Sequence, residues 1–377
     1  MESAEPTPEV DEPGRDLAEM VGDAGEFLSV LLTTDPAVEN AGQRSELRWK
    51  SLRSDLEQRG IGEEVLSAVD PFVPEAHLHG PRLEVVVSTT GARHVEHGGD
   101  PNDATEQDEG RWGRVPWILP VLSWRQATVP HVVVLIDRSG ADLFAFRREG
   151  PAVHEEVDPP GEPLTRSKPG GWSQRRYQQR AENSWEKGAG DVAKELARLV
   201  ERFEPRIIVV AGDVRAVQFL REALPKEMDE LVRVTSGERP NPDGSGGIPQ
   251  DEVDELVAEI VQSDTDEVLA KFEEELGQGD LAAEGPSAVI EALEKAQVEV
   301  LLIRDDAEDE RTAWIGPEPV HIGMARDRLE AMRVDDPVEA RLRDAAVRAA
   351  LGTAAKIRIL PDGRGPREGI GAILRWS

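Results

Sequence analysis

The sequence contains no cysteine, so it can form no disulfide bond, thiolate metal site or catalytic thiol. It also has no uninterrupted apolar run of the roughly 18 residues that a membrane-spanning helix requires. The N-terminal segment MESAEPTPEVDEPG is acidic and lacks the apolar centre of a signal peptide. These absences exclude thiol chemistry, and we expect a cytoplasmic protein without a membrane partner.

Common enzyme signatures are also missing from the sequence. It has no phosphate-binding P-loop, no dinucleotide fingerprint after a strand and no nucleophile elbow. Gly188 and Gly190 form a Gly-x-Gly pattern only inside an expected helix. His94 and His97 lie three residues apart, but no third metal ligand stands near them. The sequence therefore predicts neither a metal nor a cofactor.

Acidic residues outnumber basic ones, 75 to 44, which gives a net charge of −31 and long-range repulsion from nucleic acid. Screening limits each charge to about 8 Å at physiological salt, so local basic segments still matter. Residues 165–180 contain five basic residues and no acid, and residues 341–377 contain eight basic and three acidic residues. Each segment is either an ordinary charge fluctuation or a surface for phosphates, and we predict that both face RNA.

The chain reads as an α/β protein with an acidic tail and three domains. Residues 1–24 are rich in Pro, Glu and Asp and predict a disordered tail. An N-terminal α/β domain is expected over 25–128, a central domain over 129–280 and a C-terminal α/β domain over 284–377, which should fold alone. In the first domain we expect strands at 27–32 and 83–88, and a helix at 44–59 with Leu47, Leu52 and Leu56 on one face.

The central domain should open with a hairpin, because two apolar runs at 131–137 and 141–146 flank the turn residues Arg138, Ser139 and Gly140. Strands alternating with helices then predict a mixed sheet flanked by helices. The expected elements are a helix at 174–201, a strand at 206–210, a helix at 214–223, a strand at 231–234 and a helix at 251–276. The C-terminal domain should contain helices at 286–296 and 339–351 and strands at 298–303, 312–315, 356–360 and 371–376.

One segment, SKPGGWSQRRYQQR, combines residue types that suit binding. Gly170 and Gly171 permit positive φ and close approach to a partner. Trp172 can stack on a base, and Ser173 and Gln174 supply neutral hydrogen-bonding groups.

Four cations flank these residues, namely Lys168, Arg175, Arg176 and Arg180, and their spacing suits contact with phosphates. The alternative interpretation is an exposed turn whose Trp172 packs back onto its own domain.

Three stretches resemble the archaeal and eukaryotic class-1 release factor superfamily, which includes Pelota. VVVLIDRSGADLF at 132–144 resembles the hairpin that precedes the family's Gly-Gly-Gln loop, and Gly170 to Gln174 stand where that loop is expected. AVIEALEKAQVEVLLIRDD at 288–306 and EGIGAILRW at 368–376 resemble parts of the family's third domain. The resemblance implies an RNase H-like central domain, and a C-terminal domain similar to the third domain of these factors.

The chain also departs from the family pattern. Trp172 and Ser173 separate the two glycines from Gln174, and the first domain has no Asn-Ile-Lys-Ser motif, so no stop-codon reading is implied. The sequence is more similar to bacterial and actinobacterial relatives, including Balon-type ribosome hibernation factors.

The resemblance implies a ribosome-binding stress factor that occupies the A site and contacts rRNA. The resemblance also suggests tRNA and a translational GTPase such as EF-Tu as further candidate partners. The alternative is a codon-independent peptidyl-tRNA hydrolase for release or rescue, in which Gln174 would be the catalytic residue and would orient water.

Overall fold

The computed structural model of the protein describes residues 14–34, 36, 38–99, 107–147, 152–157, 171–239, 246–248, 250–306, 309–361 and 363–376, with the backbone alone for residues 171–185. The chain forms two compact units. One takes in residues 1–126 and 263–377, and the other takes in residues 127–262. Among the helices of the described residues, none combines the length and apolar character needed to cross a bilayer.

The unit of residues 127–262 is built on a five-stranded mixed sheet with the order β7-β6-β5-β8-β9. Its strands are β5 (His131–Ile136), β6 (Ala141–Phe146), β7 (Val153–Val157), β8 (Ile207–Gly212) and β9 (Val232–Val234). β5, β8 and β9 are parallel, whereas β6 and β7 are antiparallel to their neighbours. The pairing of β5 with β6 confirms the predicted hairpin. β7 was not expected, because its sequence VHEEV has only two apolar residues.

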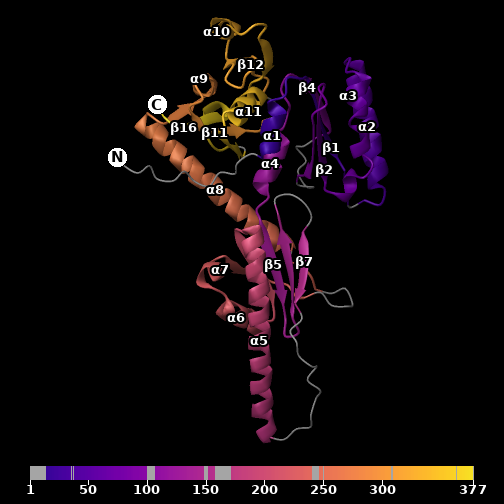
Figure 1. Ribbon diagram of the computed structural model, residues 1–377, viewed down its shortest axis with the longest axis vertical. Helices are drawn as coiled ribbons and strands as arrows, with labels where there is room; N and C mark the ends of the chain where they lie inside the picture. The colour runs from indigo at the N-terminus through magenta and orange to yellow at the C-terminus, as the bar shows by residue number, and fades with distance from the viewer. Residues whose placement is uncertain are drawn as a thin grey trace. The chain divides into compact units, whose positions relative to one another are not determined.

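Helices cover both faces of this sheet. They are α5 (Gly171–Phe203), α6 (Val214–Ala223), α7 (Lys226–Glu230) and α8 (Gln250–Gln278). Figure 1 shows α5, α6 and α7 on one side of the sheet. Val132 and Val134 of β5 pack with α5 and α6, whereas Val133 and Leu135 pack with the first half of α8. Successive strand residues point to opposite faces, so a continuous apolar run such as HVVVLI suits a strand that is covered on both sides.

A glycine fixes the turn from β8 into α6. Gly212 has a φ of 133°. A Cβ at this position would lie 1.8 Å from the carbonyl oxygen of Ile136, so no larger residue fits. The next residue, Asp213, caps α6 by accepting hydrogen bonds from the backbone N–H groups of Arg215 at 3.0 Å and Ala216 at 3.2 Å.

The other unit begins with an antiparallel sheet of order β3-β2-β1-β4. Its strands are β1 (Phe27–Thr33), β2 (Arg82–Ser88), β3 (Arg93–Gly98) and β4 (Glu109–Gly113). The accompanying helices are α2 (Ala41–Gln58), α3 (Glu63–Ser67) and α4 (Leu119–Ala127), with short 3₁₀ turns at Asp70–Phe72 and Ala76–Leu78. The apolar face predicted for α2 is wrong at Leu47, which is 59% exposed, because Trp49 and Leu56 make the buried contacts.

The C-terminal part of the same unit contains a four-stranded sheet of order β10-β16-β11-β15 and a three-stranded sheet of order β13-β12-β14. The strands are β10 (Ala282–Glu284), β11 (Val298–Arg304), β12 (Thr312–Ile315), β13 (Ile322–Gly323), β14 (Val338–Arg341), β15 (Lys356–Leu360) and β16 (Ile370–Leu374). The helices are α9 (Pro286–Glu294), α10 (Arg326–Ala331) and α11 (Leu342–Gly352), with a 3₁₀ turn at Arg367–Gly369. The helix expected from residue 339 begins instead at Leu342, since residues 338–341 pair with β12.

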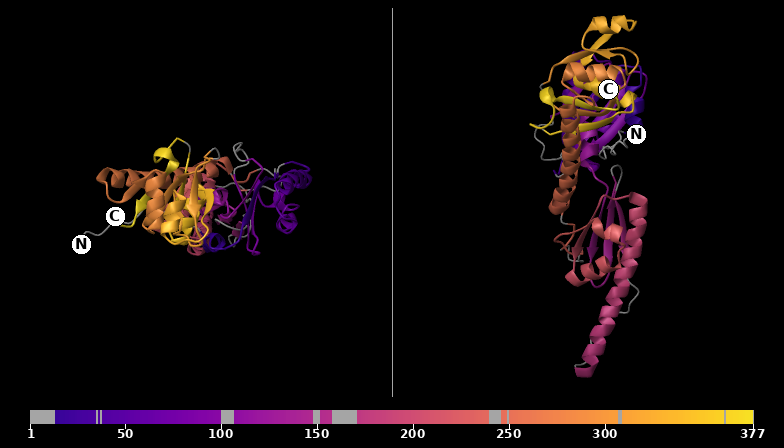
Figure 2. Two further views of the ribbon diagram at one scale, coloured as in Figure 1. Left: turned by 90° about the horizontal axis from the view of Figure 1, so that it is seen from above. Right: turned by 90° about the vertical axis from the view of Figure 1, so that its left-hand side faces the viewer.

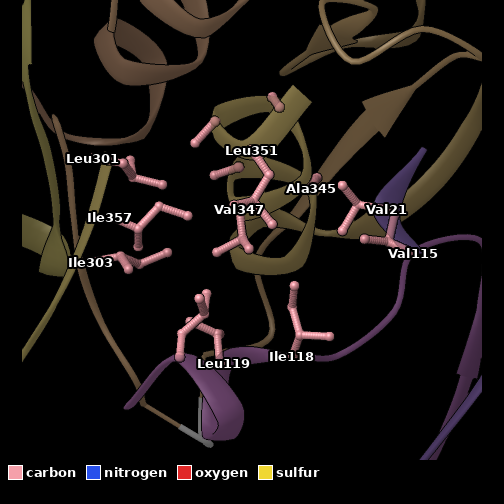
Figure 3. Packing of buried hydrophobic residues seen from close by; sticks show 14 of the residues in the cluster. Val21, Val115, Ile118, Leu119, Leu301, Ile303, Ala345, Val347, Leu351 and Ile357 are labelled. Carbon is pink, nitrogen blue, oxygen red and sulfur yellow. The ribbon is translucent and has the colours of Figure 1, made fainter. Parts of the chain in front are cut away.

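The N-terminal and C-terminal parts of this unit share one hydrophobic core. Figure 3 shows Ile118 and Leu119 from the N-terminal segment beside Val347 of α11, with Leu301 of β11 in the same cluster. Burying an aliphatic side chain of this size contributes about 1.5–3 kcal/mol. The predicted α/β class is confirmed, with a central mixed sheet between helices and a small C-terminal sheet. The division into three domains stays a prediction.

Residues 15–21 form the helix α1 (Arg15–Val21), where the sequence had suggested a disordered tail. Leu17 of this helix is completely buried. Asp16 accepts hydrogen bonds from Arg125 at 2.8 and 3.1 Å, and the same guanidinium donates to Glu96. The acidic composition concealed this helix because its partners lie about 80 to 110 residues away in the sequence. Residues 1–13 lie outside the described residues.

Candidate functional site

The second half of α5 holds this helix on the sheet. Its buried residues are Ala189, Val192, Ala193, Leu196, Leu199 and Phe203. All of these side chains except Ala189 belong to the core formed with β5, β6, β8 and α6. In Figures 1 and 2 the first half of α5 continues past the end of the sheet. A packed helix therefore carries the backbone of residues 171–185 away from its own core.

α5 begins at Gly171, three residues earlier than predicted. Gly171, Trp172, Ser173 and Gln174 thus occupy its first turn rather than a loop. Arg175, Arg176 and Arg180 follow within the next two turns. The side chains of these seven residues lie outside the described part of the chain, as do Lys168 and Gly170 entirely.

The helical backbone nevertheless fixes which positions share a face. At about 100° per residue, positions 172, 175, 176 and 180 fall within one arc of roughly 140°, and position 174 falls on the opposite side. Positions 172, 175, 176 and 180 therefore share one side of the helix, and position 174 lies on the other side. We therefore expect that mutation can separate the binding role from the catalytic role predicted for this segment.

The second basic segment, residues 341–377, is used mainly by its own fold. Arg343, Arg348 and Arg358 are 6%, 6% and 1% exposed. Arg343 donates to Asp309 at 2.7 Å and to the carbonyl oxygen of Asp306 at 2.9 Å. These three arginines are not available to RNA, so the prediction that this segment faces RNA is wrong for them.

Arg348 shows the same structural use in detail. Its guanidinium donates to the carbonyl oxygens of Gly316, Pro317 and Glu318 at distances of 2.6 to 3.3 Å. Arg375 likewise donates to the carbonyl oxygens of Thr353 and Ala354. Arg348 therefore satisfies backbone acceptors in a turn, and Arg375 satisfies those at the C-terminal end of α11.

A polar cluster that the sequence did not reveal lies on the five-stranded sheet of the unit of residues 127–262. Asp142 of β6 accepts hydrogen bonds from Arg239 at 2.6 Å and forms one with His154 of β7 at 2.9 Å. Burial opposes ionisation of Asp142, but the hydrogen bonds from Arg239 and His154 hold its pKa below the usual value. Arg239 also donates to Glu156 at 2.9 Å. The cluster ties two strands to a distant segment.

The histidine pair His94 and His97 is separated by the pleat of β3. His94 lies 3.3 Å from both Asp16 and Glu96, whereas the ring of His97 lies 4.9 Å from that of His79. Within the part of the chain that the structure describes, no group of three or more His, Asp or Glu side chains is arranged to hold a metal ion.

Comparison with known proteins gives a family match over part of the chain. Residues 130–278 match the family model named bacterial archaeo-eukaryotic release factor family 2. That range contains the β5–β6 hairpin and all of α5. Two proteins of Mycobacterium tuberculosis, from strains H37Rv and CDC 1551, are similar to this chain, and both are named as uncharacterized proteins. Each is 26% identical over 373 residues, which covers 95% of both chains.

The chain also matches the solved structures of two Pelota proteins over most of its length. Pelota of Archaeoglobus fulgidus is 16% identical with a TM-score of 0.37, and the match covers 98% of this chain and 94% of that one. Archaeal Pelota from a ribosome-bound complex with ABCE1 is 16% identical with a TM-score of 0.40, covering 98% and 96%.

Proposed function

We propose that this chain, a member of the Pelota-like release-factor superfamily, is a translation factor that binds the ribosomal A site and protects idle ribosomes. The family match over residues 130–278 supports the superfamily resemblance. The closer similarity to Balon-type hibernation factors remains part of the proposal.

One observation carries the proposal. The matched range holds α5, whose second half is packed and whose first half extends past the sheet with Trp172, Arg175, Arg176 and Arg180 on one helical face. A projecting helix with cations and an indole on one side suits contact with RNA phosphates and an unpaired base. Such binding requires no catalytic group.

Ribosome binding can be tested directly by sedimentation. Purified protein is mixed with vacant 70S ribosomes and centrifuged through a sucrose cushion at several salt concentrations. We expect co-sedimentation that weakens as salt rises, because phosphate contacts release counterions. Protein that remains in the supernatant at every salt concentration would contradict the proposal.

The second candidate function is codon-independent hydrolysis of peptidyl-tRNA. It is favoured by Gln174, which follows the two glycines within the same segment and occupies the opposite helical face from the cations. A neutral amide is not a general base at pH 7, so Gln174 would act by orienting water and by hydrogen bonding in the transition state.

The proposal includes partners and a compartment. An A-site factor would act in the cytoplasm and contact rRNA, with tRNA as a neighbour in the occupied ribosome. Delivery by a translational GTPase such as EF-Tu is the corresponding hypothesis for its arrival. Sedimentation with and without EF-Tu and GTP tests that step.

A further inference from the structure

A cleft of about 580 Å³ lies in the unit of residues 1–126 and 263–377. Strands β4 and β14 and the start of α11 form its walls, together with part of α2. Its volume is within the range of about 300–1,000 Å³ that is typical of small-molecule sites. The cleft belongs to neither the projecting part of α5 nor the Asp142 cluster.

Asp344, in the first turn of α11, lines this cleft with an almost buried carboxyl group. The residue is only 7% exposed. Among the described residues none forms a hydrogen bond with the Asp344 carboxylate, which is subject only to burial and to nearby charges. An acid in the first turn of a helix is commonly explained by the helix dipole. The helix dipole does not explain why the carboxylate is buried at a cleft, because a buried acceptor without a hydrogen-bond donor costs free energy.

Burial and the surrounding charges together bring the pKa of Asp344 close to neutral pH. Burial raises its pKa to about 7, Arg111 and Arg341 favour the ionised form, and Asp305 and Glu109 oppose it. A ligand that donates N–H groups would therefore find an acceptor that can ionise at neutral pH.

Two tryptophans line the same cleft, the partly buried Trp112 and Trp117, which is only 5% exposed. The guanidinium of Arg111 already lies over the ring of Trp117, 3.5 Å from its centroid. Bases stack on both indole rings and arginine guanidinium planes. The cleft thus offers a stacking surface close to an acceptor for hydrogen bonds.

Cations are present at the same site, which argues against a cationic ligand. Arg114 is exposed at the cleft and forms no hydrogen bond or ion pair within the described residues. Arg111 donates to Glu109, and Asp108 pairs with Arg48, so two of the lining acids are already engaged. A phosphate could therefore be held by Arg114 without competition from these acids.

We propose that this cleft binds a guanine base carrying a 5′-phosphate, with Asp344 accepting the N1–H and N2–H groups of guanine, the base stacking beside Trp112 and Trp117, and Arg114 holding the phosphate. The base could belong to a free nucleotide or to an unpaired nucleotide of RNA, since both present the same groups. The proposal does not rest on ribosome binding.

Isothermal titration of the full-length protein tests the base contact. GMP should bind at pH 8 about tenfold more tightly than IMP, which lacks the N2 amino group, and more tightly than AMP. Asp344→Asn keeps the size of the side chain and removes the paired acceptor. It should weaken GMP binding about 10- to 100-fold and abolish the preference for GMP over IMP. The matched control Asp327→Asn, at an exposed position of α10, should change neither.

The phosphate contact and the protonation state have separate measurements. Arg114→Ala should weaken binding of GMP but not of guanosine. Between pH 8 and pH 6 the wild type should lose about tenfold in affinity as Asp344 becomes protonated, and Asp344→Asn should show no such loss. A pH response equal in both proteins would remove Asp344 from the site.

Labelled oligonucleotides distinguish the two sources of the base. Tighter binding of a guanine-containing than of a matched adenine-containing oligomer, exceeding the affinity for GMP, would identify RNA, whereas GMP binding without oligomer binding would identify a free nucleotide. Equal binding of GMP, IMP and AMP overturns the proposal, as does unchanged GMP binding by the folded Asp344→Asn variant. Either negative result can coexist with ribosome sedimentation, so the two proposals fail independently.

Discussion

The two basic segments of this chain look alike in sequence but have different relations to the fold. Residues 341–377 contribute Arg343 and Arg348, whose guanidinium groups are buried and bonded to internal acceptors. Residues 171–180 of the other segment form the first part of α5, which extends past its sheet. The comparison teaches that a cluster of arginines predicts phosphate binding only where the fold does not already use the cations.

The largest expected effect concerns an arginine that the fold uses. Arg343→Ala should lower the free energy of unfolding by about 3–5 kcal/mol, because it leaves Asp309 as a buried charge without this partner. Arg367→Ala is the matched control in the same segment, since its side chain is 89% exposed. We expect that control to change stability by less than about 0.5 kcal/mol. Urea unfolding measures both, and equal effects would erase the distinction within this segment.

The second prediction concerns the arginines at the start of α5. The double variant Arg175→Glu/Arg176→Glu should weaken ribosome binding on the order of 10²-fold and reduce the slope of log K against log salt by about 2. Sedimentation at several salt concentrations provides the measurement. Lys194→Glu/Arg198→Glu, at exposed positions of the packed half of α5, is the control and should bind nearly as the wild type does. An unchanged salt slope in the first variant would remove this segment from the interface.

The third prediction separates the two proposed functions at Gln174. If the protein is a hydrolase, it should release peptide from stalled ribosomal complexes whatever the A-site codon. Gln174→Ala should then slow release by about 10²-fold, as for the loss of one positioned hydrogen bond in the transition state. If it is a hibernation factor, neither protein should release peptide above background. We expect the second pattern, and clear release by the wild type would replace our proposal with the alternative.

The smallest expected effect concerns the indole beside these arginines. Trp172→Ala should cost about 1–3 kcal/mol of ribosome-binding free energy if the ring stacks on a base. Trp172→Phe retains a stacking ring and should recover part of the loss. Gln174→Ala, on the other helical face, should leave affinity almost unchanged. If Trp172→Ala instead lowers only the unfolding free energy, the ring packs on its own domain.

Several elements could be predicted because their signals are local. Continuous apolar runs indicated β5, β6 and β8, and turn residues indicated the hairpin between the first two. β7, α1 and β14 were not recognised as such. These elements either pack against residues distant in the sequence or contain several charged residues themselves. Periodicity alone therefore gave little signal for them. The clusters around Asp142 and Asp344 were not predicted either, because their members are distant in the sequence.

The sequence by itself determined the α/β class, most strands and helices of the central segment, and the motifs that resemble the release-factor superfamily. These depend on periodicity, turn chemistry and short motifs, which neighbouring residues encode. Only the tertiary structure decided which arginines are internal, that α1 is a packed helix and that Asp344 and Trp117 line one cleft. Burial and pairing depend on residues far apart in the chain, and charge or hydropathy counted along the sequence does not contain that information.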